Sequence, residues 1–148
     1  MAAAIEEALS LASASFQNNN IELRLEMDED IRIAGYANEF SQVLLNLLGN
    51  AKDAILSSRK QDGVVTIRLS HDKSQATVVV IDNGGGIPAL VMEHIFEPYF
   101  STKEMGTGIG LYMSKLIIET SMHGAISVRN VDSGAEFTIA NLLAFPEQ

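Results

Sequence analysis

The sequence predicts a single α/β domain in which a mixed sheet carries helices packed on one face. Segments with the hydrophobic period of strands and of helices are interleaved along the chain, and at least two pairs of strands are joined as hairpins. The 148 residues are 47% hydrophobic and 20% charged, which are ordinary globular proportions and enough for one core. We therefore expect residues 1–148 to form one domain.

The composition excludes several classes of function. The chain has 19 acidic and 10 basic residues and a net charge of −9, so it lacks the basic face that nucleic acid requires. There is no cysteine for disulfides, thiolate metal sites or thiol catalysis, and His71, His94 and His123 are too scattered for a zinc site. No apolar run reaches about 18 residues, and the N-terminus lacks the basic flank and apolar stretch of a signal peptide, so we expect a cytoplasmic location.

The first part of the chain predicts a helix and two strands. Apolar residues recur at helical spacing over Ala3–Phe16, and a run of asparagines then ends the pattern. Strict apolar and polar alternation predicts a half-buried strand over Ile21–Met27. After an acidic turn, Ile31–Ile33 is expected to be the antiparallel neighbour of that strand.

The middle of the chain predicts a long helix followed by two strands. Asn38 is a good N-cap for an apolar helix that runs to about Ser58. A strand begins at Gly63 and is followed by a polar turn at His71–Gln75. The run Thr77–Ile81 does not alternate, which is typical of a central strand covered on both faces.

The last third predicts an irregular, glycine-rich region from Asp82 to Gly110, then a helix and a hairpin. The helix is expected over Leu111–Met122. Two strands follow, Ala125–Val131 and Ala135–Leu143, around the turn Asp132-Ser133-Gly134.

A polar stripe marks the long helix, which is otherwise apolar almost all round. Its members recur every three or four residues and so share one face: Gln42, Asn46, Asn50 and Asp53. Each could simply cap a neighbouring loop. Together they favour a ligand, because an Asn carbonyl is a hard oxygen suited to Mg²⁺, which takes few protein ligands and fills its shell with water and phosphate.

Asp82-Asn83-Gly84-Gly85-Gly86 follows directly on the central strand, where α/β sheets commonly bind ligands. Glycines admit a flat ligand close to the backbone, and an ionised Asp accepts but cannot donate hydrogen bonds. Asp82 therefore suits the exocyclic amine of adenine and disfavours guanine. A tight turn with an Asx cap is the alternative explanation.

Gly106-Thr107-Gly108-Ile109-Gly110 comes just before a helix, where free amides can bind phosphate. The spacing is neither the dinucleotide fingerprint nor a P-loop, and such a run can also serve only as a hinge. Between the two glycine segments lies His94–Lys103, whose aromatic residues could be plain core. Flanking glycines and polar residues within the segment indicate a lid that closes over a ligand.

Four segments in this order resemble the N, G1, F and G2 boxes of sensor histidine kinases. The segments are Asn46–Ala54, Asp82–Ile87, Ile95–Lys103 and Gly106–Leu111. The resemblance covers about residues 5–145 and is closest to the nitrogen-regulatory type. It implies the Bergerat ATP-binding fold, a two-layer α/β sandwich in which a mixed, mostly antiparallel sheet is backed by three helices, with a short ATP lid at about residues 87–106.

The resemblance also implies roles for individual residues, with ATP and Mg²⁺ as ligands. Asn50 would hold Mg²⁺, Asp82 would bind the adenine amine, and Gly86 would line the base pocket. Catalytic roles fall to Asn46, Asn50 and Lys103. The nucleotide-binding set is Asn50, Asp53, Asp82, Gly84, Gly86, Ile87, Thr102, Lys103, Gly106, Thr107, Gly108, Ile109, Gly110 and Leu111.

The sequence departs from the family pattern at three points. Ala135 stands where a Thr usually reaches adenine through water, and Ala125 stands where a second glycine follows His123-Gly124. No phosphoacceptor and dimerisation domain is present, since none of the three histidines has the acceptor motif. The chain begins directly in a helix, which suggests an excised domain.

Asn46 separates the kinase interpretation from its alternatives. Related ATPases carry a glutamate at this position as general base for water, and an amide cannot take that proton. The sequence therefore predicts transfer of the γ-phosphoryl group to a histidine on a separate dimerisation domain, with a response regulator as indirect partner. A stand-alone ATPase or anti-sigma-type serine kinase of the same fold, and a non-catalytic nucleotide-binding module, remain as alternatives. The isolated domain is expected to be monomeric and cytoplasmic, or the cytoplasmic part of a membrane-bound sensor.

Overall fold

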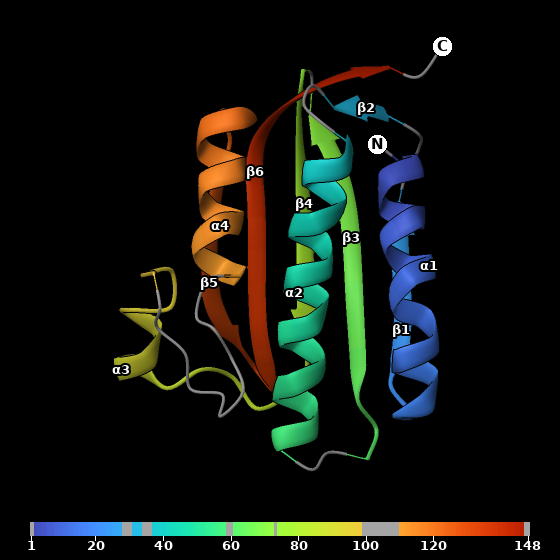
Figure 1. Cartoon of the computed structure of the whole chain (residues 1–148), viewed down its shortest axis with the longest axis vertical. Helices are drawn as coiled ribbons and strands as arrows, with labels where there is room; N and C mark the ends of the chain where they lie inside the picture. Colours follow the sequence, from blue (N-terminus) through green and yellow to red (C-terminus); the bar gives the residue numbers. More distant parts are fainter. Residues whose placement is uncertain are drawn as a thin grey trace.

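A mixed sheet forms one layer of the computed structural model, and three helices cover one of its faces (Figure 1). The structure describes residues 2–27, 31–33, 37–58, 61–72, 74–98 and 110–146. The strands are β1 (Glu22–Met27), β2 (Ile31–Ile33), β3 (Val64–Asp72), β4 (Gln75–Asp82), β5 (Ala125–Val131) and β6 (Gly134–Pro146). The covering helices are α1 (Ala2–Asn18), α2 (Ala37–Ser57) and α4 (Gly110–Leu116), which continues as the π-helical η1 (Ile117–Ser121). A short helix, α3 (Ala89–Met92), lies beside the sandwich.

The strand order is β1-β3-β4-β6, with β5 on the far side of β6. β1 runs parallel to β3, and the other pairs are antiparallel. After Asn141, whose φ is +63°, β6 still pairs with β4 at Leu142 and Leu143, and its last three residues pair with β2. The predicted two-layer sandwich, with a mostly antiparallel mixed sheet and three helices, is therefore confirmed.

The core lies between α2 and the centre of the sheet. Phe40, Leu44 and Leu47 on α2 are fully buried, as are Ile67 on β3 and Ile139 on β6. Burying side chains of this size stabilises the fold by about 1.5–3 kcal/mol each. The helix that carries the polar stripe is thus firmly anchored on the sheet.

Two predictions about the strands are wrong, one about the partner of Ile31–Ile33 and one about the burial of β4. Ile31–Ile33 pairs antiparallel with the end of β6, and β1 pairs with β3. A parallel pair needs a long crossover, which α2 supplies. β4 is not covered on both faces either, because Val78 and Val80 are buried while Val79 and Ile81 are half-buried on the face without helices.

Some predicted boundaries also shift. α2 begins at Ala37, so Asn38 lies inside the helix and is not its N-cap. β3 and β4 pair as far as Asp72 and Gln75, which makes the turn shorter than the predicted His71–Gln75. The helix expected from Leu111 begins at Gly110. None of the helices in the described ranges is both long and apolar enough to cross a membrane.

Candidate functional site

Asp82 ends the central strand β4 with its side chain on the buried, helix-covered side of the sheet, where only 5% of the residue is exposed. Its Oδ1 accepts hydrogen bonds from the N–H of Gly84 (2.8 Å) and of Ala135 (3.4 Å). Burial raises the pKa of this carboxyl above its ordinary value, although the two backbone N–H groups act to lower it. Within the described residues both hydrogen bonds reach Oδ1, so Oδ2 is left for a ligand. The Asx turn and a binding role are therefore compatible.

Close packing and backbone conformation each explain why glycines follow Asp82. A Cβ at Gly84 would lie 2.8 Å from the backbone of Ala54 on α2. Gly85 and Gly86 have φ values of +96° and +84°, which are strained for other residues. A Cβ at Gly86 would also meet Oδ1 of Asn130 at 2.9 Å. This segment, residues 82–87, is called the glycine loop below; α2 and the β5–β6 turn hold it in place.

Asn46 joins α2 to the first turn of α4. Its Nδ2 donates to the carbonyl oxygen of Gly110 (3.3 Å) and to Oγ of Ser114 (3.2 Å), and its Oδ1 accepts from Gln42 (3.4 Å). Ser114 is fully buried and its hydroxyl donates to the same Gly110 oxygen (2.8 Å). The catalytic role predicted for Asn46 remains a prediction, while the structure gives this amide a role in fixing α4.

Exchanging the Asn46 amide for a carboxylate, Asn46→Asp, is expected to destabilise the domain by about 1–2 kcal/mol. The carboxylate has no N–H to donate to Gly110, and its charge would face that carbonyl oxygen. Urea unfolding measures the difference. Asn38→Asp is the matched control: Asn38 is exposed near the start of α2, where a negative charge is neutral or slightly stabilising. Equal loss of stability in the two variants, or none in Asn46→Asp, would contradict the assignment.

α2 connects the two ends of the candidate site. Its residue Ala54 packs on Gly84 of the glycine loop, and its residue Asn46 bonds to Gly110 at the start of α4. The two positions are eight residues apart, or about 12 Å along a helix. Asn50 and Asp53 lie between them, both half-buried. The polar stripe therefore extends along α2 from the glycine loop to the start of α4.

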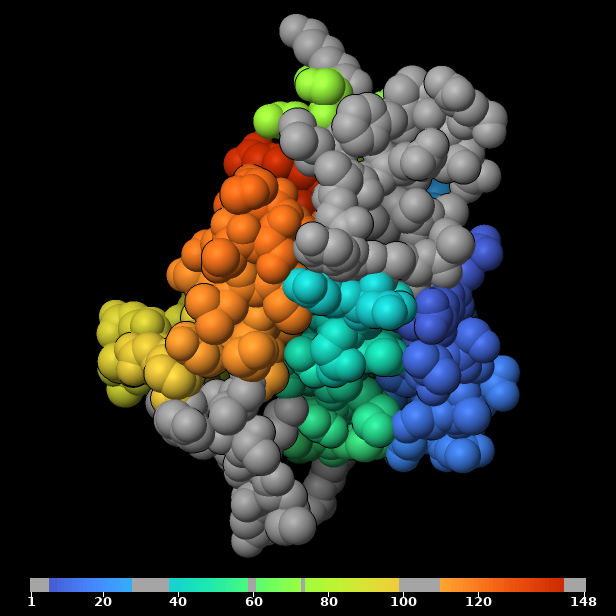
Figure 2. Space-filling model, turned by 45° about the horizontal axis from the view of Figure 1, so that its top comes forward, coloured from blue at the N-terminus to red at the C-terminus, as the bar shows by residue number. Residues whose placement is uncertain are grey.

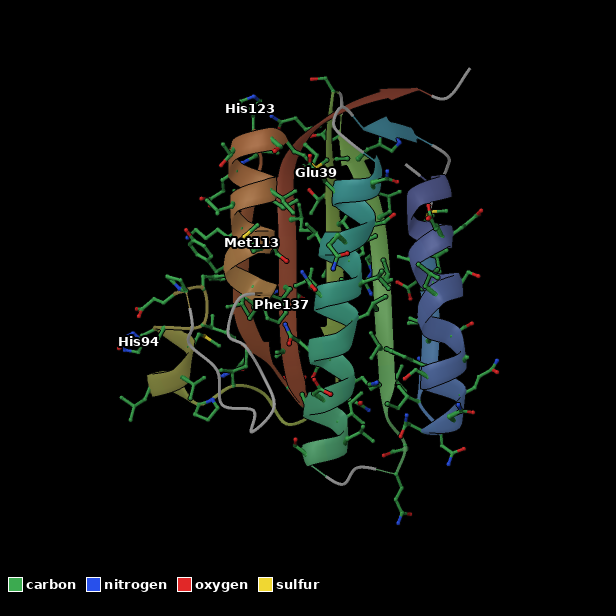
Figure 3. All side chains as sticks on the ribbon, in the orientation of Figure 1. Glu39, His94, Met113, His123 and Phe137 are labelled. Atoms are coloured by element: carbon green, nitrogen blue, oxygen red, sulfur yellow. The ribbon has the colours of Figure 1, made fainter. Side chains whose placement is uncertain are left out.

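The part of the predicted lid that the structure describes, residues 87–98 (the lid segment), packs against α4 and β6. Phe96 meets the buried Phe137 edge-on with 6.3 Å between ring centroids, and Nζ of Lys115 lies 5.3 Å from the Phe96 centroid. Phe137 lies on β6 beside the lower end of α4, and His94 lies farther out, next to α3 (Figure 3). A hydrogen bond to the Glu97 carboxylate (2.5 Å) raises the pKa of His94. Core packing is thus part of what Phe96 does, while Tyr99 and Phe100 lie outside the described residues.

α4 and α2 lie side by side on the molecular surface, with the lid segment projecting beyond α4 (Figure 2). A groove of about 380 Å³ runs between the lid segment and α4. Its lining includes Phe96, Tyr112 and Leu116 with the charged Glu97 and Lys115. The lid segment is therefore held at Phe96, with a hollow beside it.

The structure places some predicted site residues and leaves others outside its description. Asn46, Asn50, Asp53, Asp82, Gly84, Gly86, Ile87, Gly110 and Leu111 lie along α2, the glycine loop and the start of α4. Thr102, Lys103, Gly106, Thr107, Gly108 and Ile109 lie outside the described residues. No group of three His, Asp or Glu residues that could hold a metal ion occurs in the part of the chain that the structure describes.

Sequence reasoning missed two contributors to the site. Ser114 completes the Asn46 bonds, and Asn130 on β5 bonds the backbone of Ile87. A buried serine one turn into a predicted helix is a weak signal, and Asn130 has none, because an exposed strand position tolerates any polar residue. The three histidines lie at the end of β3 (His71), in the turn after α3 (His94) and after η1 (His123).

Comparisons with known proteins agree on one family. Residues 35–144 match the family described as histidine kinase-, DNA gyrase B-, and HSP90-like ATPase. The two-component sensor PprA of Pseudomonas aeruginosa is 34% identical over 155 residues, covering 99% of this chain but only 16% of PprA. The chain thus spans a small part of that relative.

Solved structures match at the level of the whole domain. A nucleotide-free catalytic domain of histidine kinase ThkA superposes with a TM-score of 0.87 at 30% identity, covering 97% of this chain and 92% of that domain. ThkA in complex with the response regulator protein TrrA gives a TM-score of 0.79 at 28% identity, covering 97% of this chain and 40% of the ThkA chain. The chain therefore belongs to the histidine kinase-, DNA gyrase B- and HSP90-like ATPase family, as a catalytic domain of the sensor histidine kinase type.

Proposed function

We propose that this chain binds Mg-ATP and positions it for transfer of the γ-phosphoryl group to a histidine of a separate dimerisation domain. The observation that carries the proposal is Asp82, a buried carboxylate at the end of the central strand whose Oδ2 is left for a ligand. An acceptor held in this way suits the exocyclic amine of adenine. A base without a donor at that position would leave the buried Asp82 carboxylate unpaired.

The residues present fit Mg²⁺ held largely by phosphate and water. Asn50 supplies a hard oxygen from the half-buried stripe of α2, and Mg²⁺ commonly takes only one or two protein ligands. When bound, the ion would neutralise charge on the phosphates. Lys103 is proposed to add positive charge from the lid, and Gly106, Gly108 and Gly110 to offer backbone amides to the phosphates.

In the proposed transfer, the bond between the γ-phosphorus and the β,γ-bridging oxygen breaks and a bond from phosphorus to an imidazole nitrogen forms. ADP leaves, and the histidine proton passes to solvent. The chain itself contributes placement: Asp82 holds the base, and α2 spans from the base end to the phosphate end. Such catalysis depends mainly on orientation and charge stabilisation.

Asn46 favours this function over the alternatives of the same fold. A stand-alone ATPase needs a base for water, and the amide of Asn46 cannot take a proton and is engaged with Gly110 and Ser114. A response regulator is proposed as the indirect partner, supported by the solved complex of the similar ThkA with its regulator. We further propose that residues 1–148 act as one monomeric catalytic domain, serving as the cytoplasmic part of a sensor.

Calorimetry with ATP and Mg²⁺, paired with a phosphate-release assay, tests the proposal. The isolated chain is expected to bind Mg-ATP with little or no hydrolysis. Adding a dimerisation and phosphoacceptor domain with γ-labelled ATP should then label the acceptor histidine. Absence of binding, or hydrolysis at the rate of a dedicated ATPase, would refute the proposed function. Binding without transfer to any acceptor would favour the non-catalytic module.

Asn50→Ala is expected to remove most of the dependence of ATP affinity on Mg²⁺, because the proposed protein ligand is lost. Titrations with ATP in Mg²⁺ and in EDTA measure this dependence in the parent and the variant. Gln42→Ala is the matched control, since Gln42 lies on the same stripe two turns earlier and is exposed. The same Mg²⁺ dependence in Asn50→Ala as in the parent would assign the metal to another residue.

A further inference from the structure

The β5–β6 hairpin touches the glycine loop at three successive points. Ala135 N–H donates to Asp82 Oδ1 at the start of the loop (3.4 Å), and Gly85 N–H donates to the carbonyl oxygen of Ser133 in its middle (2.9 Å). At the end of the loop, Asn130 bonds Ile87. The loop that carries Asp82 is therefore shaped by the hairpin as well as by its own sequence.

Asn130 binds the backbone of Ile87 in both directions. Its Oδ1 accepts from the Ile87 N–H (2.8 Å) and its Nδ2 donates to the Ile87 carbonyl oxygen (2.8 Å). A side-chain amide presents an acceptor and a donor side by side, so the pair imitates one rung of a β-ladder. Ile87 is the first residue of the lid, and Asn130 thus fixes the point at which the lid leaves the sheet.

Gly86 makes the arrangement specific. Its φ of +84° turns the chain toward the lid, and Oδ1 of Asn130 occupies the space that a Cβ at Gly86 would need. Asn130 itself is exposed on β5, directly opposite Ala135 in the hairpin. Exposed hydrogen bonds contribute little to global stability. The two hydrogen bonds between Asn130 and Ile87 are therefore better explained by the local backbone conformation that they select.

We propose that Asn130 is a positioning residue for nucleotide binding, which holds Gly86 and Ile87 in the conformation that completes the base pocket. The inference rests on the proposed function and deepens it. Without Asn130, the binding-competent loop conformation is one of several. Apparent affinity then falls in proportion to the population of that conformation, so a loop that is competent one-tenth of the time binds about tenfold more weakly.

Asn130→Ala tests the proposal through affinity and hydrogen exchange measured on the same folded chain. We expect ADP and ATP to lose affinity by the same factor, about tenfold, with and without Mg²⁺, because Asn130 acts at the base end. The Ile87 amide should exchange faster, since its acceptor is gone. Asn130→Asp keeps an acceptor for the Ile87 N–H but sets a carboxylate oxygen against the Ile87 carbonyl oxygen, so it should not restore the parent affinity.

Arg129→Ala is the matched control on the same strand. Arg129 bonds Glu136 across the hairpin (2.9 Å), and among the described residues its side chain makes no hydrogen bond or ion pair with the glycine loop. The Arg129→Ala variant should bind ADP and ATP with the affinity of the parent chain. Parent-like affinity in a folded Asn130→Ala chain would overturn the inference while leaving the proposed function intact, whereas a parent chain that binds no nucleotide would refute both. Unfolding of both Asn130 variants would also overturn the inference, because Asn130 would then be required for the stability of the whole domain.

Discussion

A folded Asp82→Asn variant is expected to bind ATP at least about a hundredfold more weakly than the parent chain. The oxygen of the introduced amide would keep the position of Oδ1, because the N–H groups of Gly84 and Ala135 both point at it. The NH₂ group of that amide would then replace Oδ2 and present a donor to the donor amine of adenine. The loss combines a missing hydrogen bond with a buried unsatisfied group.

The same substitution should leave the fold intact or slightly more stable at neutral pH. Burial raises the pKa of Asp82, so the folded state holds its proton more tightly than the unfolded state does. The stability contribution of this group is therefore greatest at low pH and is lost as the pH rises through the raised pKa. A neutral Asn avoids the cost of burying the charge.

The pH dependence of binding has the opposite sign. The ionised carboxylate is the form that accepts the adenine amine, so affinity should fall as the pH drops through the raised pKa, at a higher pH than an ordinary Asp would give. Calorimetry across acidic pH, with urea unfolding to verify the fold, measures both effects. Asp132→Asn removes one exposed acidic charge from the β5–β6 turn and is the control for net charge. Unchanged affinity in folded Asp82→Asn would contradict the role of Asp82.

The fold was predictable from sequence wherever one period dominated. The alternation of β3 and the long apolar pattern of α2 specified both elements, and the hairpin of β5 and β6 followed from its turn. The partner of Ile31–Ile33 was not predictable, because three residues carry almost no register information and their true partner lies more than a hundred residues away. The burial of Thr77–Ile81 was predicted wrongly. The half-buried residues on the open face of this strand are as aliphatic as the buried ones, so the sequence does not distinguish the two faces.

The candidate site likewise contains residues that could be predicted from the sequence and residues that could not. The places of Asp82 and of the α2 stripe could be predicted because polar residues stand out in apolar surroundings, while their roles in binding stay predictions. The reason for Gly84 could not be predicted, because it is the approach of Ala54 from another element. Asn130 could not be predicted either, since its value lies in meeting the backbone of Ile87 across 43 residues of sequence. Tertiary contacts of this kind leave no local pattern.

Gly134→Ala is expected to destabilise the domain by about 3 kcal/mol or more. An added Cβ would lie 1.9 Å from the carbonyl oxygen of Asp82, 2.6 Å from its carbonyl carbon and 2.8 Å from Cα of Asn83. These are backbone atoms at the junction of β4 and the glycine loop, which cannot rotate away as a side chain would. Relief requires β6 and β4 to separate where Ala135 bonds Asp82, so nucleotide affinity should fall along with stability.

Gly49→Ala is the matched control, because Gly49 lies within α2 and an added Cβ there would meet nothing within 4 Å. Replacing a mid-helix glycine with alanine should stabilise the domain by about 0.5–1 kcal/mol, so the same chemical change has opposite signs at the two positions. Urea unfolding of the two variants and the parent measures the difference. Gly134→Ala with parent-like stability would mean that β4 and β6 are not packed as closely as described, and the hairpin could not then hold the loop that carries Asp82.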